Sequence, residues 1–272
     1  MAENQNSPFA GAGGFTVPSM PSPAPSTTST IKSVSGLPRP RTHALRPGSA
    51  KEDQVRHFVS ERLNHITRRF LKRTGKAPPG SEVEGYNSMR DLCKDLEGVI
   101  NIVWLSGTPN LQIPLLLHIA GEFNTWLAGL PPSPAATFAT LRKLDHCFAS
   151  LLSGEDIETH EPLPGFDSGR RAGMSKTDMV RCRSVVEEAR VLVVEVMSRE
   201  READGDGEEE QTADEDASGV ETQVESDAEL FEEDEEEEDL LFMDVARVYE
   251  NTLVKLGETL GETLANTEVC SE

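Results

Sequence analysis

Three reactive side chains stand together at Asp145–His146–Cys147, and an acid, a base and a thiol are the groups that nucleophilic catalysis requires. Neighbouring residues on a helix point about 100° apart, so these three cannot hydrogen-bond in series with one another. The simpler interpretation is a core Cys147 beside exposed or capped polar neighbours.

Motifs for other chemistries are absent from the sequence. It has no HExxH, no GxSxG and no dinucleotide fingerprint, and Gly169–Lys176 misses the spacing of a phosphate-binding loop. We therefore expect no catalytic residue, no cofactor-binding residue, no metal ligand and no cofactor.

The loop predicted at Gly154–Gly173 keeps an enzyme or a cation site open as an alternative. Its polar residues include Asp156, Glu158, His160 and Glu161. Carboxylates and an imidazole could ligate a cation, and an active site would need His160 to converge with Asp156 or Asp167. Alternating carboxylates in a loop are more often simply solvated, so this alternative ranks last.

A basic stripe marks the predicted helix Ala50–Thr74. Its members are Arg62, His65, Arg69, Lys72 and Arg73. Such a stripe is typically a solvated face, but it would also suit nucleic-acid phosphates or an acidic partner, including the chain's own Glu232–Asp239 run. No aromatic residues alternate with these cations to stack bases, so nucleic acid is the weaker binding hypothesis.

Two serines of the acidic segment, Ser218 and Ser226, have an acidic residue at +3, the pattern that acid-directed kinases favour. Both are candidate phosphorylation sites. Two basic clusters, Arg68–Arg73 and Pro38–Arg46, are candidate nuclear-import signals. The second is the better one because it is predicted to be exposed.

Charge is strongly segregated along the chain. The formal net charge is −22, and residues 200–239 hold 22 acidic residues and one Arg, net −21. The four cysteines form no CxxC pair, which favours buried thiols in a reducing compartment. The sequence predicts neither a membrane span nor a signal peptide. We expect a soluble protein that is not secreted and is nuclear rather than cytoplasmic.

Apolar periodicity predicts an all-α fold, a helical bundle of about five helices. The expected helices are Ala50–Thr74, Ser88–Ser106, Asn110–Ala128, Pro134–Ser153 and Lys176–Arg199. Capping boxes, Ser88 with Asp91 and Ser175 with Asp178, begin the second and the fifth. The fifth is rich in β-branched residues, so a strand at Val191–Val196 is the alternative.

A detached amphipathic helix is predicted near the C-terminus. Its stripe is Leu241, Val245, Val248, Leu253, Leu256, Leu260 and Leu264. An isolated helix of this length with two glycines is marginal in water, so the stripe must be buried somewhere. We expect it to return to the bundle at the helix Ala50–Thr74, although docking on another chain or self-association remains open.

The predicted organisation has five parts: residues 1–49 disordered, 50–199 the helical bundle, 200–239 an acidic disordered linker, 240–265 the amphipathic helix and 266–272 a tail. The densest apolar runs lie between Ser88 and Gly154 and contain both tryptophans, Trp104 and Trp126. We expect both indoles to be mostly buried.

Three short stretches carry a resemblance to a known family: Leu105–Pro114, Pro131–Pro134 and Leu141–His146. In these the chain resembles a family of mostly uncharacterised filamentous-fungal proteins that automated naming sometimes ties to meiotic recombination. The likeness covers about Lys51–Met197 and implies no catalytic residue. The chain lacks the nucleotide-binding loop of a strand-exchange recombinase, so a meiotic role would be an accessory one.

The sequence favours a non-enzymatic nuclear scaffold or adaptor that works through contacts with unknown protein partners and is accessory to a DNA or chromosome process. The alternative is an accessory factor that binds nucleic acid through the basic face of the helix Ala50–Thr74. An enzyme with a site in the 154–173 loop comes third. We expect no membrane partner, and the sequence leaves the oligomeric state open.

Overall fold

The structure is a computed structural model that describes residues 35–74, 84–166, 173–205 and 243–268. Within these ranges the chain is all-α, as predicted, and forms no strand beyond an isolated bridge between Glu155 and Pro162. The predicted N-terminal arm up to residue 34, most of the acidic linker and the last four residues lie outside this description.

The first two helices, α1 (Ala50–Leu71) and α2 (Met89–Leu105), pack against each other. A 3-10 turn, Lys72–Thr74, extends α1 to the predicted end of its helix. Ser88 is the N-cap of α2, but the predicted capping box is wrong in detail, since its side chain makes no capping hydrogen bond. The N–H of Met89 instead donates to the carbonyl of Pro131, 3.0 Å away.

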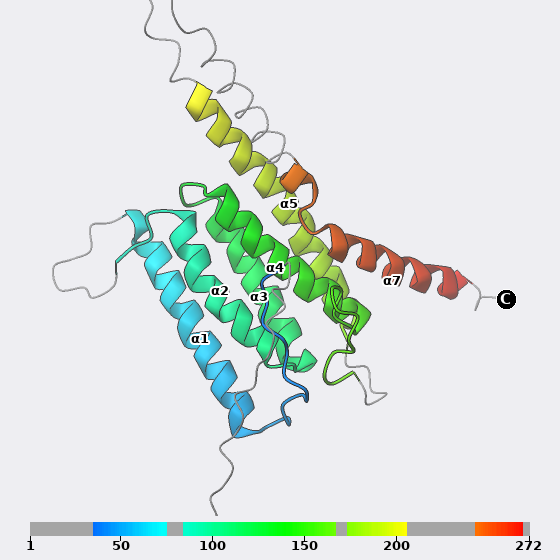
Figure 1. Cartoon of the computed structure of the whole chain (residues 1–272). Helices are drawn as coiled ribbons and strands as arrows, with labels where there is room; N and C mark the ends of the chain where they lie inside the picture. The colour runs from blue at the N-terminus through cyan, green and yellow to red at the C-terminus, as the bar shows by residue number, and fades with distance from the viewer. Residues whose placement is uncertain (1–34, 75–83, 167–172, 206–242, 269–272) are drawn as a thin grey trace, which may run out of the picture. The chain divides into compact units, whose positions relative to one another are not determined.

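The next two helices, α3 (Pro109–Leu127) and α4 (Pro134–Ser153), lie in the middle of the bundle (Figure 1). Both begin with a proline in the first turn, where the missing N–H costs nothing. Helix α4 ends at Gly154, whose φ of +80° is the left-handed conformation that glycine adopts without strain. Trp104 and Trp126 are each 1% exposed, which confirms their predicted burial.

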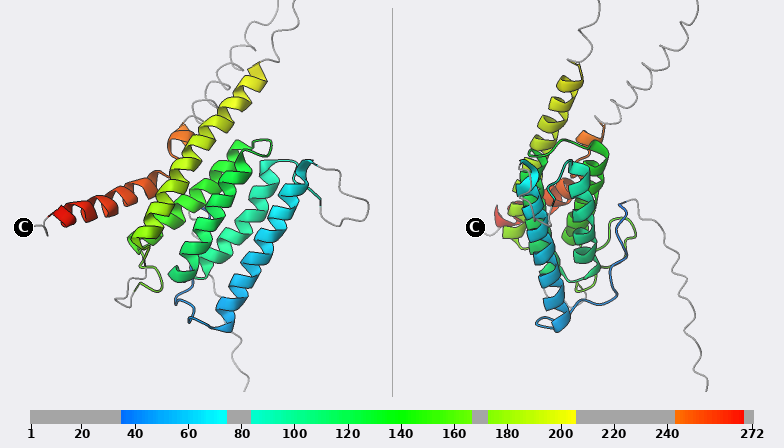
Figure 2. Two further views of the ribbon diagram at one scale, coloured as in Figure 1. Left: turned by 180° about the vertical axis from the view of Figure 1, so that it is seen from behind. Right: turned by 90° about the vertical axis from the view of Figure 1, so that its left-hand side faces the viewer.

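Helix α5 (Lys176–Gly205) packs on α3, on the side of the bundle opposite α1 (Figures 1 and 2). Its predicted capping box is confirmed, since the N–H of Asp178 donates to Ser175 Oγ and the N–H of Ser175 donates to Asp178 Oδ2, both at 3.2 Å. The strand alternative at Val191–Val196 is wrong. The helix also continues past its predicted end at Arg199 to Gly205, and the first four added residues, Glu200–Ala203, are good helix formers.

The C-terminal helix α7 (Glu250–Glu268) packs on α4 and α5, so the predicted return to the bundle is found but the expected receiving helix, α1, is wrong. The predicted continuous helix is also interrupted. Residues 247–249 form a turn, and Tyr249 has a φ of +56°. Its ring is 1% exposed and lies 6.2 Å from the ring of Phe148, so tertiary packing holds this backbone conformation.

Residues 35–49 fall in the stretch whose composition predicts disorder, yet in the structure they run along the bundle. Leu37 and Leu45 are buried, and the N–H of Leu45 donates to Thr108 Oγ1 at 2.8 Å. Exposed Arg39 pairs with Glu161 at 2.7 Å. Two apolar side chains and a few backbone hydrogen bonds hold this segment, a signal too sparse for a composition argument to detect.

Candidate functional site

The predicted basic stripe does not form a single free surface. Arg69 pairs with Asp95, and its guanidinium lies 4.0 Å from the centre of the Tyr86 ring. Arg73 donates to the carbonyl of Gly129 at 2.8 Å and stacks 3.8 Å from the centre of the Phe70 ring. These two arginines therefore fasten α1 to its neighbours.

The other members of the stripe, Arg62, His65 and Lys72, have different surroundings. Arg62 is exposed, with its guanidinium 5.7 Å from the centre of the Phe58 ring, whereas His65 and Lys72 are half-buried. Contact between this stripe and a partner or a phosphate therefore stays a prediction. Ser218 and Ser226 lie outside the described residues, so their phosphorylation also stays a prediction.

The Asp145–His146–Cys147 run is buried in all three positions, so its polar members are capped rather than exposed. Successive residues of α4 face different neighbours, as the helical geometry requires. Burial raises the pKa of the Cys147 thiol far above its usual value, and it raises the pKa of Cys93 to about 11 and of Cys182 to about 12. These thiols are protonated at neutral pH, and the predicted core role of Cys147 is confirmed.

Asp145 caps the N-terminus of α7 from another helix. The N–H and the hydroxyl of Thr252 donate to Asp145 Oδ1 at 2.8 Å and 2.6 Å, and Asn251 Nδ2 donates to Oδ2 at 2.9 Å. A carboxylate at this position satisfies the free N–H groups of the first turn and complements the helix dipole. Asp145 is therefore the polar anchor of α7.

His146 points to the loop that follows α4. Its Nε2 lies 3.1 Å from Asp156 Oδ2, and its Nδ1 lies 3.3 Å from Glu158 Oε1. Asp156 Oδ1 accepts the N–H groups of Glu158 and Thr159 at 2.9 Å and 3.0 Å. Burial by itself raises the pKa of Asp156, but the hydrogen bonds from His146 and from these two N–H groups hold that pKa below its usual range.

This geometry bears on the alternatives placed in the 154–173 loop. Asp156 is directed to His146, whereas His160 is exposed and pairs only distantly, at 3.9 Å, with Glu155. His160 and Asp156 therefore do not converge, and Asp167 lies outside the description. Among the described residues no group of His, Cys, Asp or Glu has a metal-binding arrangement.

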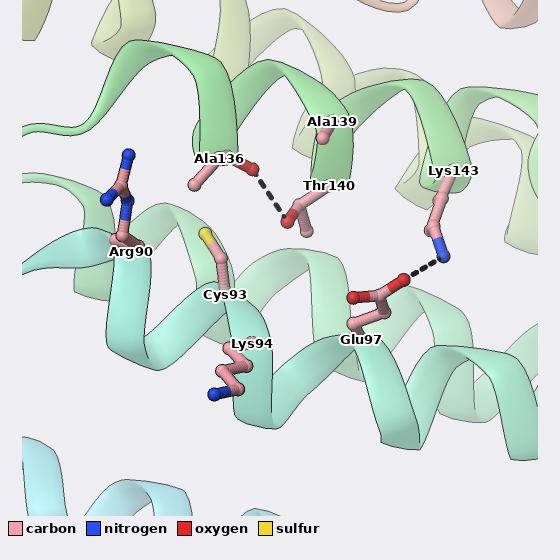
Figure 3. Close-up of a pocket in the computed structure, with 8 residues that line it drawn as sticks. All are labelled: Arg90, Cys93, Lys94, Glu97, Ala136, Ala139, Thr140 and Lys143. Atoms are coloured by element: carbon pink, nitrogen blue, oxygen red, sulfur yellow. Dashed lines mark hydrogen bonds and ion pairs between the residues drawn. The ribbon is translucent and has the colours of Figure 1, made fainter. Parts of the chain in front are cut away.

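A pocket of about 190 Å³ opens between α2 and α4 (Figure 3). Eight residues line it: four uncharged ones, here called its floor (Cys93, Ala136, Ala139 and Thr140, of which Ala139 is exposed), and four charged ones, here called its rim (Arg90, Lys94, Glu97 and Lys143, of which Lys143 is buried). Lys143 is 6% exposed, and its ammonium donates to Glu97 at 2.6 Å, to Asn101 and to the carbonyl of Gly36. The ammonium is saturated by protein oxygens, so the rim's available charge comes from the two exposed cations, Arg90 and Lys94.

Sequence reasoning missed the buried anchors Lys143 and Asp145. A signal existed for Asp145, which falls beside Leu144 on the apolar stripe of the predicted helix Pro134–Ser153. An acid on a buried stripe requires hydrogen-bond donors, and α7 supplies them. For Lys143 no such signal existed, since two of its acceptors lie 46 and 107 residues away in the sequence.

Comparisons with known proteins give two matches. A family model described as subunit 11 of the general transcription factor TFIIH (TFB6) matches residues 85–257. An uncharacterised protein of Schizosaccharomyces pombe is 25% identical over 149 residues, which cover 54% of this chain and 80% of that protein. No solved structure gives a significant match. The yeast relative agrees with the resemblance to uncharacterised fungal proteins, and neither match concerns meiotic recombination.

Proposed function

Since the chain belongs to the family of subunit 11 of the general transcription factor TFIIH, we propose that it is a non-enzymatic accessory protein of such an assembly. It acts in the nucleus and works through protein–protein contacts. The observation that carries the proposal is the extent of the match, residues 85–257, which runs from the start of α2 into the first turns of α7.

The polar groups inside the bundle support a binding role rather than a catalytic one. Asp145 anchors α7, His146 anchors the following loop, and Lys143 joins α4 to α2 and to the N-terminal segment. Each of these groups is engaged with another part of the chain. A catalytic site would instead direct such groups together into a cleft that admits a substrate.

The outer face of α5 is the surface we assign to the TFIIH contact. Val191 and Val194 are 68% and 51% exposed, and Val180, at 59%, lies on the same side of the helix. Exposed apolar side chains that share one helix face are typical of protein interaction sites. The face lies inside the matched region, so the family model covers it.

A co-purification experiment tests both the function and the face. The tagged full-length chain should recover TFIIH subunits from nuclear extract at low salt, and V191S/V194S should recover about tenfold less, as expected if the two side chains lie at the centre of a contact. The matched control is L71S/V254S, which changes two exposed apolar residues on α1 and α7. Recovery of no TFIIH subunit by the unaltered chain would refute the function, whereas equal recovery by all variants would refute the face alone.

Nucleic-acid binding through the basic face of α1 is the rival proposal. Its support is weaker than the stripe suggests, because the guanidinium groups of Arg69 and Arg73 already bind protein groups. A mobility-shift assay with duplex DNA at low salt distinguishes the two. A shift that R62E/K72E abolishes would favour the rival, and no shift would remove it.

A further inference from the structure

We propose that the pocket between α2 and α4 is the docking site for the chain's own acidic run Glu232–Asp239. The sequence pointed to the basic stripe of α1 as a receiver for this run, but two of that stripe's arginines bind protein groups. The pocket has the complementary charge, a small apolar floor and a position that the run can reach. This inference does not depend on membership of a TFIIH assembly.

The charge of the rim favours an anionic occupant. Lys143 and Glu97 form an ion pair at 2.6 Å and neutralise each other at one end of the pocket. Arg90 and Lys94 lie one helical turn apart on α2, with the Arg90 guanidinium directed toward α4 and the Lys94 ammonium directed away from it (Figure 3). Within the described part of the chain neither makes a hydrogen bond or an ion pair. Two adjacent exposed cations without internal partners favour an anionic ligand.

The floor of the pocket is lined by small side chains that leave room for a peptide. Cys93, Ala136 and Ala139 give it small side chains, and Figure 3 shows the Cys93 sulfur facing the gap between the helices. Cys93 is 4% exposed, and burial raises the pKa of its thiol to about 11, so no thiolate repels an incoming anion at neutral pH. A peptide backbone can approach such a floor more closely than one lined by long side chains.

The acidic run is tethered close to the pocket. Asp244 pairs with Arg142 of α4 at 3.4 Å, so the chain that follows the acidic run is already fixed on α4. The residues of α4 that line the pocket lie, on average, about 110° around the helix axis from Arg142. Along the helix surface this separates Arg142 from the pocket by roughly 10 Å. Asp239 precedes Asp244 by five residues, which span about 17 Å when extended. The C-terminal end of the run can therefore reach the pocket while Asp244 stays paired with Arg142.

The occupant follows from charge and tethering. All eight residues of Glu232–Asp239 are acidic, so every register of the run presents carboxylates to Arg90 and Lys94. Covalent attachment close to the pocket gives the run a high effective concentration, which a free acidic peptide of similar affinity would lack. Since the cations are exposed, the contact is screened by salt.

Lysine acylation of the full-length chain, read by mass spectrometry, tests the docking. Lys94 should be acylated about threefold more slowly at low salt than in a variant whose Glu232–Asp239 residues are all Gln or Asn, the scale of an exposed ion-pair contact. The difference should disappear at high salt, and exposed Lys51 and Lys176 should react equally in both chains. Equal Lys94 rates at low salt would overturn the proposal.

A matched variant separates docking from bulk charge. It neutralises eight other acids of the same segment: Glu202, Asp204, Asp206, Glu208, Glu209, Glu210, Asp214 and Glu215. Under the proposal this variant keeps the protection of Lys94, whereas an equal loss of protection in both variants would overturn it. Circular dichroism verifies that both chains remain folded.

Carbodiimide coupling identifies the occupant directly. An amide between Lys94 and a carboxylate of Glu232–Asp239 is expected within one chain, and its yield should fall in R90E, which keeps the Lys94 amine. A mixture of ¹⁵N-labelled and unlabelled chains assigns each coupled peptide to one copy or to two. Peptides that couple only between copies, or only to a different protein added from extract, would overturn the assignment to the chain's own run.

Discussion

Helices α1 and α7 flank the same central bundle but are attached to it by different physics. Helix α1 buries an apolar stripe of Val59, Leu63, Ile66 and Phe70, spaced three or four residues apart, and Arg69 and Arg73 add polar contacts at its C-terminal end. Among the side chains that the structure describes, helix α7 up to residue 261 and the turn before it bury fewer apolar groups, chiefly Val248, Tyr249 and Leu256, and rely on the hydrogen bonds to Asp145.

The difference determines what each contact specifies. Apolar burial is non-directional, so a stripe such as that of α1 stabilises association without fixing a unique register. A buried carboxylate that accepts three hydrogen bonds is satisfied in one register only, and leaving it unpaired carries a desolvation penalty. We infer that the apolar stripe of α1 contributes mainly stability and that Asp145 fixes where α7 begins.

The largest expected effect tests this inference at Asp145. Asp145→Ala removes the carboxylate and leaves the N–H of Thr252 buried without a partner, while the hydroxyl of Thr252 keeps only the backbone carbonyl of position 145, 3.2 Å away. This loss should cost about 3–5 kcal/mol of α7 docking. Amide hydrogen exchange in residues 250–260 should then accelerate by more than 100-fold. Asp91→Ala, an exposed acid on α2, is the control.

Deletion of Leu241–Glu272 sets an upper limit on the loss of global stability that Asp145→Ala can cause. The chain can release α7 instead of unfolding, so Asp145→Ala cannot lower the global stability by more than the deletion does. Unaltered exchange in residues 250–260 of Asp145→Ala would show that apolar contacts alone hold α7, and the contrast with α1 would fail.

A smaller effect is expected at the centre of the α1 stripe. Ile66 is 1% exposed, and Ile66→Ala should lower the free energy of unfolding by about 3 kcal/mol, because it removes buried methyl groups and leaves a cavity. Urea unfolding measures the loss. Exchange in residues 250–260 should stay as in the unaltered chain until global unfolding, because α7 does not pack on α1.

These two helices also show what a sequence can and cannot predict. The stripe of α1 is spaced by local helical geometry, so its apolar face and its end were readable from the sequence. The break at Tyr249 was not, because no glycine or proline marks it and its φ of +56° depends on packing against residues distant in the chain. Local patterns identified the helices, and tertiary contacts decided how the last one is joined.

The candidate site shows the same limit. Arg69 and Arg73 were predicted as part of a basic stripe from their side of a helix, which their spacing does specify. Their partners, Asp95 and the carbonyl of Gly129, lie 26 and 56 residues away. Helical spacing places a cation on a face, but only the fold shows whether that face is already occupied.

Acid should weaken the polar contacts of the fold more than the apolar ones, because only the polar contacts involve groups that titrate. The pKa of Asp156 is lowered in the folded chain, so its stabilising contribution is fully present above the unfolded pKa of about 4 and is lost as pH falls through the lower folded pKa. Unfolding free energies between about pH 5 and pH 2 should fall less steeply in Asp156→Asn than in the unaltered chain. Identical slopes would contradict the ionised state of Asp156 in the fold.

The smallest expected effect sharpens the contrast within the α7 attachment. Arg142 and Asp244 form an ion pair at 3.4 Å with side chains 54% and 38% exposed, a setting in which solvent screens the attraction. Arg142→Met keeps most of the aliphatic stem and should cost at most about 1 kcal/mol, measured by urea unfolding and by exchange in residues 250–260. If Arg142→Met released α7 as Asp145→Ala is expected to, anchoring would depend on charge at the surface. A small loss would instead locate the anchor at the buried carboxylate, where the hydrogen bonds have no competing water.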